Sequence, residues 1–229
     1  MHNFLFGIYP YIALSVLVIG SIARYETDPF TWKTSSSQLL RRKQLILGSV
    51  LFHLGILVIF FGHFVGLMTP IQIFDALGIS HSAKQLLAMG AGGIAGVLSL
   101  IGGLLLLHRR LFDSRIRKTS SFADIGILAI IVLQLILGIG TIFVSAQHLD
   151  GHEMTKFMTW TQKIVTFRAG AAEEIADVAL IFKLHMFLGL TIFVLFPFTR
   201  LVHMLSAPIR YVLRPGYQIV RSRRRHPAE

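Results

Sequence analysis

The chain has 229 residues, of which 54% are hydrophobic and only 14% are charged, and its formal net charge is +11. This composition excludes an ordinary soluble domain, and the lack of cysteine excludes disulfides, cysteine-ligated iron–sulfur clusters and covalent C-x-x-C-H haem attachment. The basic residues gather at alternate ends of the predicted helices, so membrane topology explains the net charge and a nucleic-acid role is rejected.

Five apolar segments predict membrane-spanning helices at residues 9–23, 45–68, 84–108, 123–146 and 178–203. Each approaches the roughly 20 residues that cross a bilayer as a helix. The first segment is the shortest, and residues 4–8 could extend it. We therefore predict an all-α fold, in which residues 1–229 form a single polytopic membrane domain of five transmembrane helices.

The orientation follows from the basic residues. Seventeen of the 22 Lys and Arg residues follow the first, third and fifth spans, at one side of the membrane. The positive-inside rule then places the amino terminus outside and the carboxyl terminus in the cytoplasm. The basic tail, about residues 208–229, is expected either to bind lipid headgroups or to dock onto a cytoplasmic subunit.

The connecting segments carry further predictions. The sequence GHEMTKFMTWTQKIVTF predicts an amphipathic helix on the outer surface, with Phe157 and Trp160 at the membrane interface. Residues 69–83 predict a short outer connection with an interfacial helix. The third span is rich in glycine, a pattern that favours close helix packing over a cofactor site; these residues are Gly90, Gly92, Gly93, Gly96, Gly102 and Gly103.

Four histidines lie inside two of the predicted spans: His53 and His63 in the second, and His185 and His203 in the fifth. A polar ring in the bilayer is costly, and such residues usually face the bundle interior and serve a function. Because the two spans run in opposite directions, depth pairs His53 with His203 and His63 with His185. Two bis-imidazole sites of this kind would hold two b-type haems non-covalently.

The spacing of these histidines fits only in part. Ten residues separate the second-span pair by roughly 15 Å of helix, and eighteen separate the fifth-span pair by roughly 27 Å. Pro197 is expected to kink the fifth span between its two histidines. Angular spacing places His185 and His203 on one helix face, and His63 roughly 80° from His53.

Two other classes of protein remain open on the residues alone. In a haem-free anchor, the four histidines would simply bond neighbouring helices. In a proton-coupled transporter they would form a relay, which calls for discontinuous helices or inverted repeats, and neither is indicated by the sequence. A measurement of bound haem would distinguish a cytochrome, which contains it, from both of these classes.

Several long segments resemble the gamma subunit of respiratory nitrate reductase, the membrane cytochrome b that anchors this enzyme in the bacterial cytoplasmic (inner) membrane. They include IYPYIA, TWKTSSSQLLRRK, LFHLGILVIFFGHFVGLMTP, MGAGGIAGVL and HMFLGLTIFVLFPFTRLVHMLSAP. The resemblance implies that His53 and His203 bind the inner haem b, and that His63 and His185 bind the outer one. This agrees with the pairing by depth.

The resemblance also implies a quinol pocket on the outer side, formed by Gly62, His63 and Lys84. Without it, Lys84 would be interpreted as an anchor that snorkels to the interface. Electrons from quinol would pass to a cytoplasmic iron–sulfur beta subunit, and a molybdenum alpha subunit would reduce nitrate. The alternative is a cytochrome b subunit of another cytoplasmic reductase, one that acts on sulfur compounds or heterodisulfides.

Three arginines at the inner level, Arg109, Arg110 and Arg200, are candidates to pair with the propionates of the inner haem. Their other interpretation is that they anchor helix ends at the inner surface.

Overall fold

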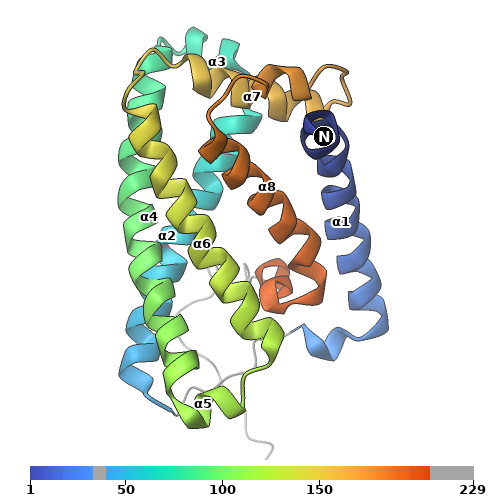
Figure 1. The fold of residues 1–229 in the computed structure, drawn as a ribbon, viewed down its shortest axis with the longest axis vertical. Coiled ribbons are helices and arrows are strands. Elements are labelled where there is room, and N and C mark those ends of the chain that lie inside the picture. The colour runs from blue at the N-terminus through green and yellow to red at the C-terminus, as the bar shows by residue number, and fades with distance from the viewer. Residues whose placement is uncertain (33–39, 207–229) are drawn as a thin grey trace, which may run out of the picture.

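The computed structural model describes residues 1–32 and 40–206, which form only helices and connecting turns, with no strand among them. Five helices are long and apolar enough to cross a membrane, as predicted. They are α1 (Tyr9–Thr27), which continues a π-helical turn at Phe4–Ile8, α2 (Arg42–Met68), α4 (His81–Phe112), α6 (Phe122–Ser145) and α8 (Leu180–Leu195) (Figure 1).

Polar caps set where these apolar helices begin. The Ser80 hydroxyl accepts the backbone N–H of Ala83 at the start of α4, and Ser121 and Asp124 form a reciprocal capping box at the start of α6. Between them, the Asp113 carboxylate caps the short helix α5 (Ser114–Lys118). The turn from α4 to α6 is therefore fixed by side-chain bonds to otherwise unsatisfied backbone N–H groups.

The spanning helices pack in the order α2, α4, α6, α8 and α1, and within the described residues α8 packs closely against α6 and α1 rather than α2. Glycines bring α2 and α4 together. A Cβ added to Gly102 would lie 2.4 Å from the backbone nitrogen of Phe52, and one added to Gly55 would lie 2.4 Å from the carbonyl oxygen of Ala95. The glycine-rich span thus serves close packing, as predicted, although Gly90 and Gly92 face open space.

One end of the bundle is covered by the short helix α3 (Ile71–Ala76) and by α7 (His152–Val165) (Figure 1). The predicted helix at this position is confirmed, but the prediction that Trp160 lies at the lipid interface is wrong. Trp160 is buried in the core, and its Nε1–H donates to the carbonyl of Phe6 at 2.9 Å. A buried indole needs an acceptor for its N–H, and the first turn of the chain supplies it.

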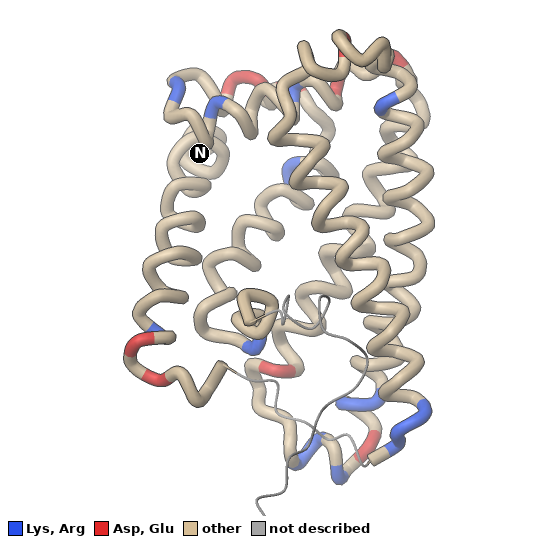
Figure 2. The backbone as a smooth tube through the Cα atoms, turned by 180° about the vertical axis from the view of Figure 1, so that it is seen from behind, with Lys and Arg blue, Asp and Glu red and all other residues tan. Residues whose placement is uncertain are grey.

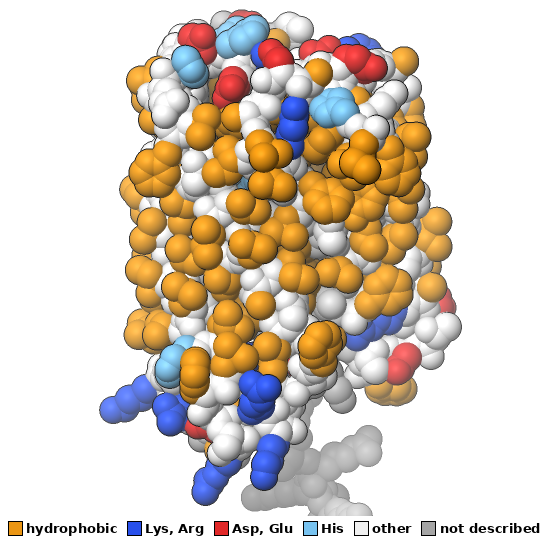
Figure 3. All heavy atoms as spheres, in the orientation of Figure 1, with side chains coloured by type: hydrophobic (Ala, Val, Ile, Leu, Met, Phe, Trp, Pro, Cys, Tyr) orange, Lys and Arg blue, Asp and Glu red, His pale blue; other side chains and the backbone are white. Residues whose placement is uncertain are grey.

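The two ends of the bundle differ in charge (Figure 2). Among the described residues, the end that holds α5 carries ten Lys and Arg residues and four acidic ones, whereas the end covered by α7 carries five basic and six acidic residues. A band of apolar side chains separates the two ends on the face shown in Figure 3. The predicted basic tail, about residues 208–229, lies outside the described residues.

The last span departs from its prediction. The α-helix ends at Leu195 instead of continuing to residue 203, and two 3₁₀-helical segments follow at Phe196–Phe198 and Arg200–Ser206. Pro197 has no N–H to donate and its ring clashes with the preceding turn, so the regular α-helix does not continue through it. The predictions of a kinked helix that continues to residue 203, and of one shared helix face for His185 and His203, are therefore wrong.

Candidate functional site

The four interior histidines form two facing pairs. The ring centroids of His53 and His203 are 6.2 Å apart with their planes at 67°, and those of His63 and His185 are 6.2 Å apart with their planes at 41°. In each pair, one ring comes from α2 and the other from the last span. The structure thus brings together the same partners that depth in the membrane indicates.

The break in the last span explains how both pairs meet. A continuous helix would separate His185 from His203 by roughly 27 Å, whereas His53 and His63 are only roughly 15 Å apart along α2. After Leu195 the chain curls beside the end of α8 instead of running on (Figure 1). His203 therefore reaches the level of His53, which removes the mismatch in spacing.

Three of the four rings are oriented by a backbone carbonyl close by in their own segment. The Nδ1–H of His53 donates to the carbonyl of Ser49 at 2.8 Å, and that of His63 donates to the carbonyl of Ile59 at 2.9 Å. The Nδ1–H of His203 donates likewise to the carbonyl of Arg200. Because Nδ1 carries the proton, the Nε2 lone pair of each ring is available to a metal ion.

The spacing of each pair fits a single metal ion held between two imidazoles. Imidazole nitrogens bind first-row metals at about 2 Å and the ring centre lies roughly 1 Å further out, so two trans rings on one ion have centroids roughly 6 Å apart. The His53 and His63 side chains are exposed in the protein alone, and a bare polar ring at bilayer depth is costly unless something covers it. A flat iron porphyrin between the two rings of each pair meets both requirements.

Within residues 1–32 and 40–206, no group of three His, Cys, Asp or Glu side chains could hold a metal ion. Each pair supplies two nitrogens, which matches the two axial positions of a haem iron.

Two glycines shape the space around the outer pair. A Cβ added to Gly138 of α6 would lie 2.9 Å from Cε1 of His185, so this glycine makes room for the ring. Gly62, the neighbour of His63, has no atom within 4 Å of an added Cβ. A flat molecule can therefore approach α2 beside His63.

Lys84 is buried near the outer pair rather than extended to the interface, so the snorkelling interpretation is wrong. Its Nζ donates to the carbonyl of Gly66 at 2.9 Å and lies 3.9 Å from the centroid of the Phe74 ring, with Met158 Sδ beside it. Gly66 is only three residues beyond His63 on α2, roughly 5 Å along the helix. Lys84 therefore sits about one helical turn outward from the outer pair.

Sequence reasoning did not identify Phe74 and Met158, because the patterns of the α3 and α7 segments predict surface helices and indicate no contact with Lys84. It also did not identify Gln134 of α6, whose amide contacts His185. Gln134 had a usable signal, since it is a lone amide inside an apolar span, where polar side chains usually have a role.

The three predicted arginines lie at the inner end and already have partners. Arg109 is buried and its Nη2 donates to the carbonyl of Leu40 at 2.6 Å, while Arg110 donates to the Ser120 hydroxyl at 3.0 Å. Arg200 forms an ion pair with Asp124, with 2.8 Å between Nε and Oδ1.

Taken together, these features define a class: a multi-pass helical membrane protein in which two pairs of histidines face each other at two depths. The comparison with known families is more specific. The model of the nitrate reductase gamma subunit family matches residues 2–223, nearly the whole chain.

Relatives in two bacteria agree with this match. The chain is 52% identical to the respiratory nitrate reductase 1 gamma chain of Escherichia coli, over 97% of this chain and 98% of the relative, and 53% identical to the respiratory nitrate reductase 2 gamma chain, over 98% of each. It is 41% identical to the nitrate reductase gamma chain of Bacillus subtilis, over 96% of this chain and 97% of the relative. The chain belongs to the nitrate reductase gamma subunit family and is a membrane subunit of an oxidoreductase complex.

This membership bears on the alternatives. A subunit of a sulfur-compound or heterodisulfide reductase finds no support in these matches, which all concern nitrate reductase. The last span is discontinuous, contrary to the sequence-based prediction, but the family and the facing histidine pairs favour electron transfer over transport.

Proposed function

We propose that this chain is the di-haem cytochrome b subunit of a respiratory nitrate reductase, which oxidises quinol at the outer side of the bacterial cytoplasmic membrane and anchors the complex in the lipid. The proposal depends on one observation: at each of two depths in the bundle, two histidines face each other with their ring centroids 6.2 Å apart. Two bound b haems supply one-electron carriers across the membrane, between quinol outside and an iron–sulfur beta subunit and a molybdenum alpha subunit inside.

The proposed ligands are His53 and His203 for the inner haem, and His63 and His185 for the outer haem. Carbonyl acceptors at Nδ1 fix the ring orientation and raise the basicity of Nε2, which strengthens a bond to iron. Arg109, Arg110 and Arg200 supply positive charge and N–H donors at the inner end for haem propionates.

The proposed quinol site lies between Gly62, His63 and Lys84. The partners of Lys84 are a carbonyl, a thioether and an aromatic ring, so no carboxylate from residues 1–32 or 40–206 pairs with its charge. A buried ammonium in this state stabilises negative charge on a quinol oxygen as the hydroxyl loses its proton. The released protons are expected to leave at the end covered by α3 and α7.

The proposed orientation puts the α7 end outside and the α5 end in the cytoplasm. The excess of basic residues at the α5 end supports this through the positive-inside rule. Oxidising quinol outside and consuming electrons inside moves charge across the membrane, worth about 2.3 kcal/mol per elementary charge and 100 mV for a full crossing. The proposed topology is therefore the one that conserves energy.

The first experiment is a pyridine haemochrome spectrum with haem-to-protein stoichiometry on the purified complex. We expect two b-type haems per chain. A folded preparation from haem-replete cells that contains no haem would overturn the proposal and leave the histidines as helix-packing residues.

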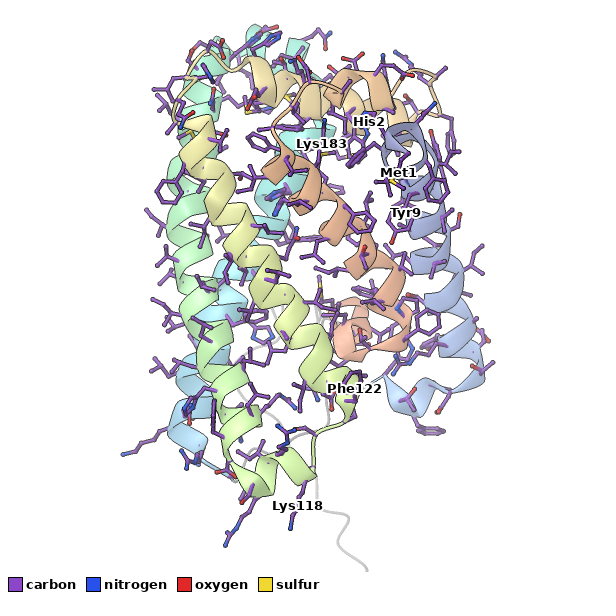
Figure 4. The ribbon with its side chains drawn as sticks, in the orientation of Figure 1. Met1, His2, Tyr9, Lys118, Phe122 and Lys183 are labelled. Carbon is purple, nitrogen blue, oxygen red and sulfur yellow. The ribbon has the colours of Figure 1, made fainter. Side chains whose placement is uncertain are left out.

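A second experiment tests the quinol site. Lys84→Ala is expected to keep both haems but to slow quinol oxidation about 100-fold, the typical cost of losing one donor to a developing oxyanion. The matched control is Lys183→Ala, since Figure 4 shows Lys183 at the same end of the bundle and its Nζ donates to the carbonyl of Ala176. Equal rates in the Lys84 variant and the wild type would remove Lys84 from the site.

A further inference from the structure

Gln134 is an amide side chain in the middle of α6, which has the highest mean hydropathy of the five spans, 2.8. A polar group at this depth is costly unless it is bonded. The Nε2 of Gln134 donates to the backbone carbonyl of His185 at 3.0 Å and lies 3.4 Å from the Nε2 of the same residue. Both contacts of this amide therefore go to one proposed ligand of the outer haem.

His185 differs from the other three interior histidines in how its ring is held. His53, His63 and His203 each direct Nδ1–H to a backbone carbonyl three or four residues earlier. The Nδ1 of His185 is buried and has no partner among the described residues, and the same is true of Oε1 of Gln134. One buried donor site and one buried acceptor thus remain open on two side chains that touch.

The amide lies in a space that is shaped for it. A Cβ added to Gly189, one turn after His185 on α8, would lie 3.2 Å from Nε2 of Gln134. On α6, Gly138 leaves room for the His185 ring in the same way, one turn after Gln134. Two glycines on two helices therefore allow this amide and this ring to meet.

We propose that Gln134 is a positioning residue for His185. Its NH₂ group holds the backbone carbonyl of His185 and lies 3.4 Å from Nε2 of the ring. When the ring turns Nε2 to the iron of the outer haem, the Nδ1–H donates to the open Oε1 of Gln134. This inference rests on the proposed function, because it takes His185 as an iron ligand. The proposed bond comes to the outer pair from a neighbouring helix, whereas the printed Nδ1 partners of the inner pair, Ser49 and Arg200, lie in the same segments as His53 and His203.

The bond has a defined consequence for the redox centre. An acceptor at Nδ1–H raises the basicity of the ligand imidazole, which favours oxidised iron and lowers the midpoint potential. Loss of the acceptor should therefore shift the midpoint potential of the outer haem to more positive values. The inner haem should not respond, since the rings of its two ligands are held by carbonyls of Ser49 and Arg200.

The test is potentiometry with low-spin EPR on the full complex carrying Gln134→Met, which keeps the length of the side chain and removes its polar atoms. We expect two haems per chain, a positive shift of the outer midpoint potential, a changed outer EPR signal and an unchanged inner haem. Gln134→Glu should restore the wild-type values, because a protonated carboxyl has one O–H donor and one acceptor oxygen.

Val132→Ala is the matched control, since Val132 lies on the opposite face of α6 and packs beside Gly103 of α4. Loss of the outer haem in Gln134→Met, with recovery in Gln134→Glu, also supports the positioning role. The same shift or loss in Val132→Ala would instead assign the effect to packing and overturn it. If the wild type holds two haems and Gln134→Met leaves both midpoint potentials and both EPR signals unchanged, only this role is overturned. A wild type without haem overturns the proposed function as well.

Discussion

The inner and outer histidine pairs have the same ring separation but are built in different ways. The outer pair joins two regular helices, α2 and α8, and its surroundings include Gln134, Gly138 and Lys84 from two further helices. The inner pair joins α2 to a 3₁₀-helical segment beyond a helix break, and His203 is oriented by its own segment through the carbonyl of Arg200.

This difference shows how one chain can place two equal sites on helices of unequal spacing. Along α2 the two histidines are ten residues apart, and only a break in the partner span lets eighteen residues cover the same depth. The inner site therefore depends on the α-helix ending at Leu195 and on the 3₁₀ segments that follow. The outer site depends on side chains of neighbouring helices. The two sites should respond to different mutations.

The largest expected effect comes from removing a ligand. His63→Ala or His185→Ala should remove the outer haem, retain the inner one and abolish quinol oxidation, because the proposed quinol site adjoins the outer pair. His53→Ala or His203→Ala should show the reverse haem content. Haem stoichiometry and redox titration distinguish the four variants, and a variant of either pair that keeps two haems and full activity would show that the pairing is wrong.

A smaller effect is expected from disturbing the break alone. A Cβ added to Gly20 of α1 would lie 2.8 Å from Cγ of Pro197, and a proline ring cannot rotate away. Gly20→Leu should therefore displace the segment that leads to His203, at a cost of about 1–3 kcal/mol for overpacking. We expect weaker binding of the inner haem and an unchanged outer haem, measured by haem retention during mild denaturation.

The control for this variant is Gly126→Leu, because an added Cβ at Gly126 of α6 meets no atom within 4 Å. Loss of the outer haem in Gly20→Leu, or equal effects in both variants, would contradict the separate dependence of the two sites.

Much of this architecture follows from local signals in the sequence. The apolar runs define all five spans, because a helix is the only way for such a run to satisfy its backbone in lipid. Depth then pairs the histidines without any knowledge of helix packing. The prediction of an amphipathic helix within residues 151–167 is confirmed as well by α7, since it too depends only on local periodicity.

The features that local signals did not reveal are those in which distant segments act on one another. Pro197 signals a disturbance, but whether a helix kinks or ends depends on the contacts beyond the proline, here with Gly20 of α1. Trp160 has the composition of an interface residue, yet its partner is Phe6, more than 150 residues earlier in the chain. Likewise, the burial of Lys84 depends on where α3 and α7 fold over the end of the bundle.

The smallest expected effect concerns the charged caps at the two ends. Asp113, at the α5 end, accepts backbone N–H groups of Ile116 and Arg115 and forms an ion pair with Arg41, and these bonds lower the pKa of its carboxyl below the ordinary value. Because the pKa is lowered in the folded protein, the stabilisation is present above the unfolded pKa of about 3.9 and is lost as the pH falls through the folded pKa.

Asp113→Asn isolates the charge, because asparagine caps a helix about as well as aspartate. We expect a lower unfolding temperature than wild type at pH 7, and a difference that shrinks as the pH falls below about 4. Asp177→Asn is the counterpart at the α7 end, where the pKa of Asp177 is lowered mainly by its bond from Lys156. The side chain of Asp113 is 16% exposed and that of Asp177 is 69% exposed, so water screens the ion pair of Asp113 less and the Asp113 variant should lose more. A thermal melt of the detergent-solubilised complex measures both, and a loss in Asp113→Asn that does not change with pH would assign the effect to the shape of the side chain instead of its charge.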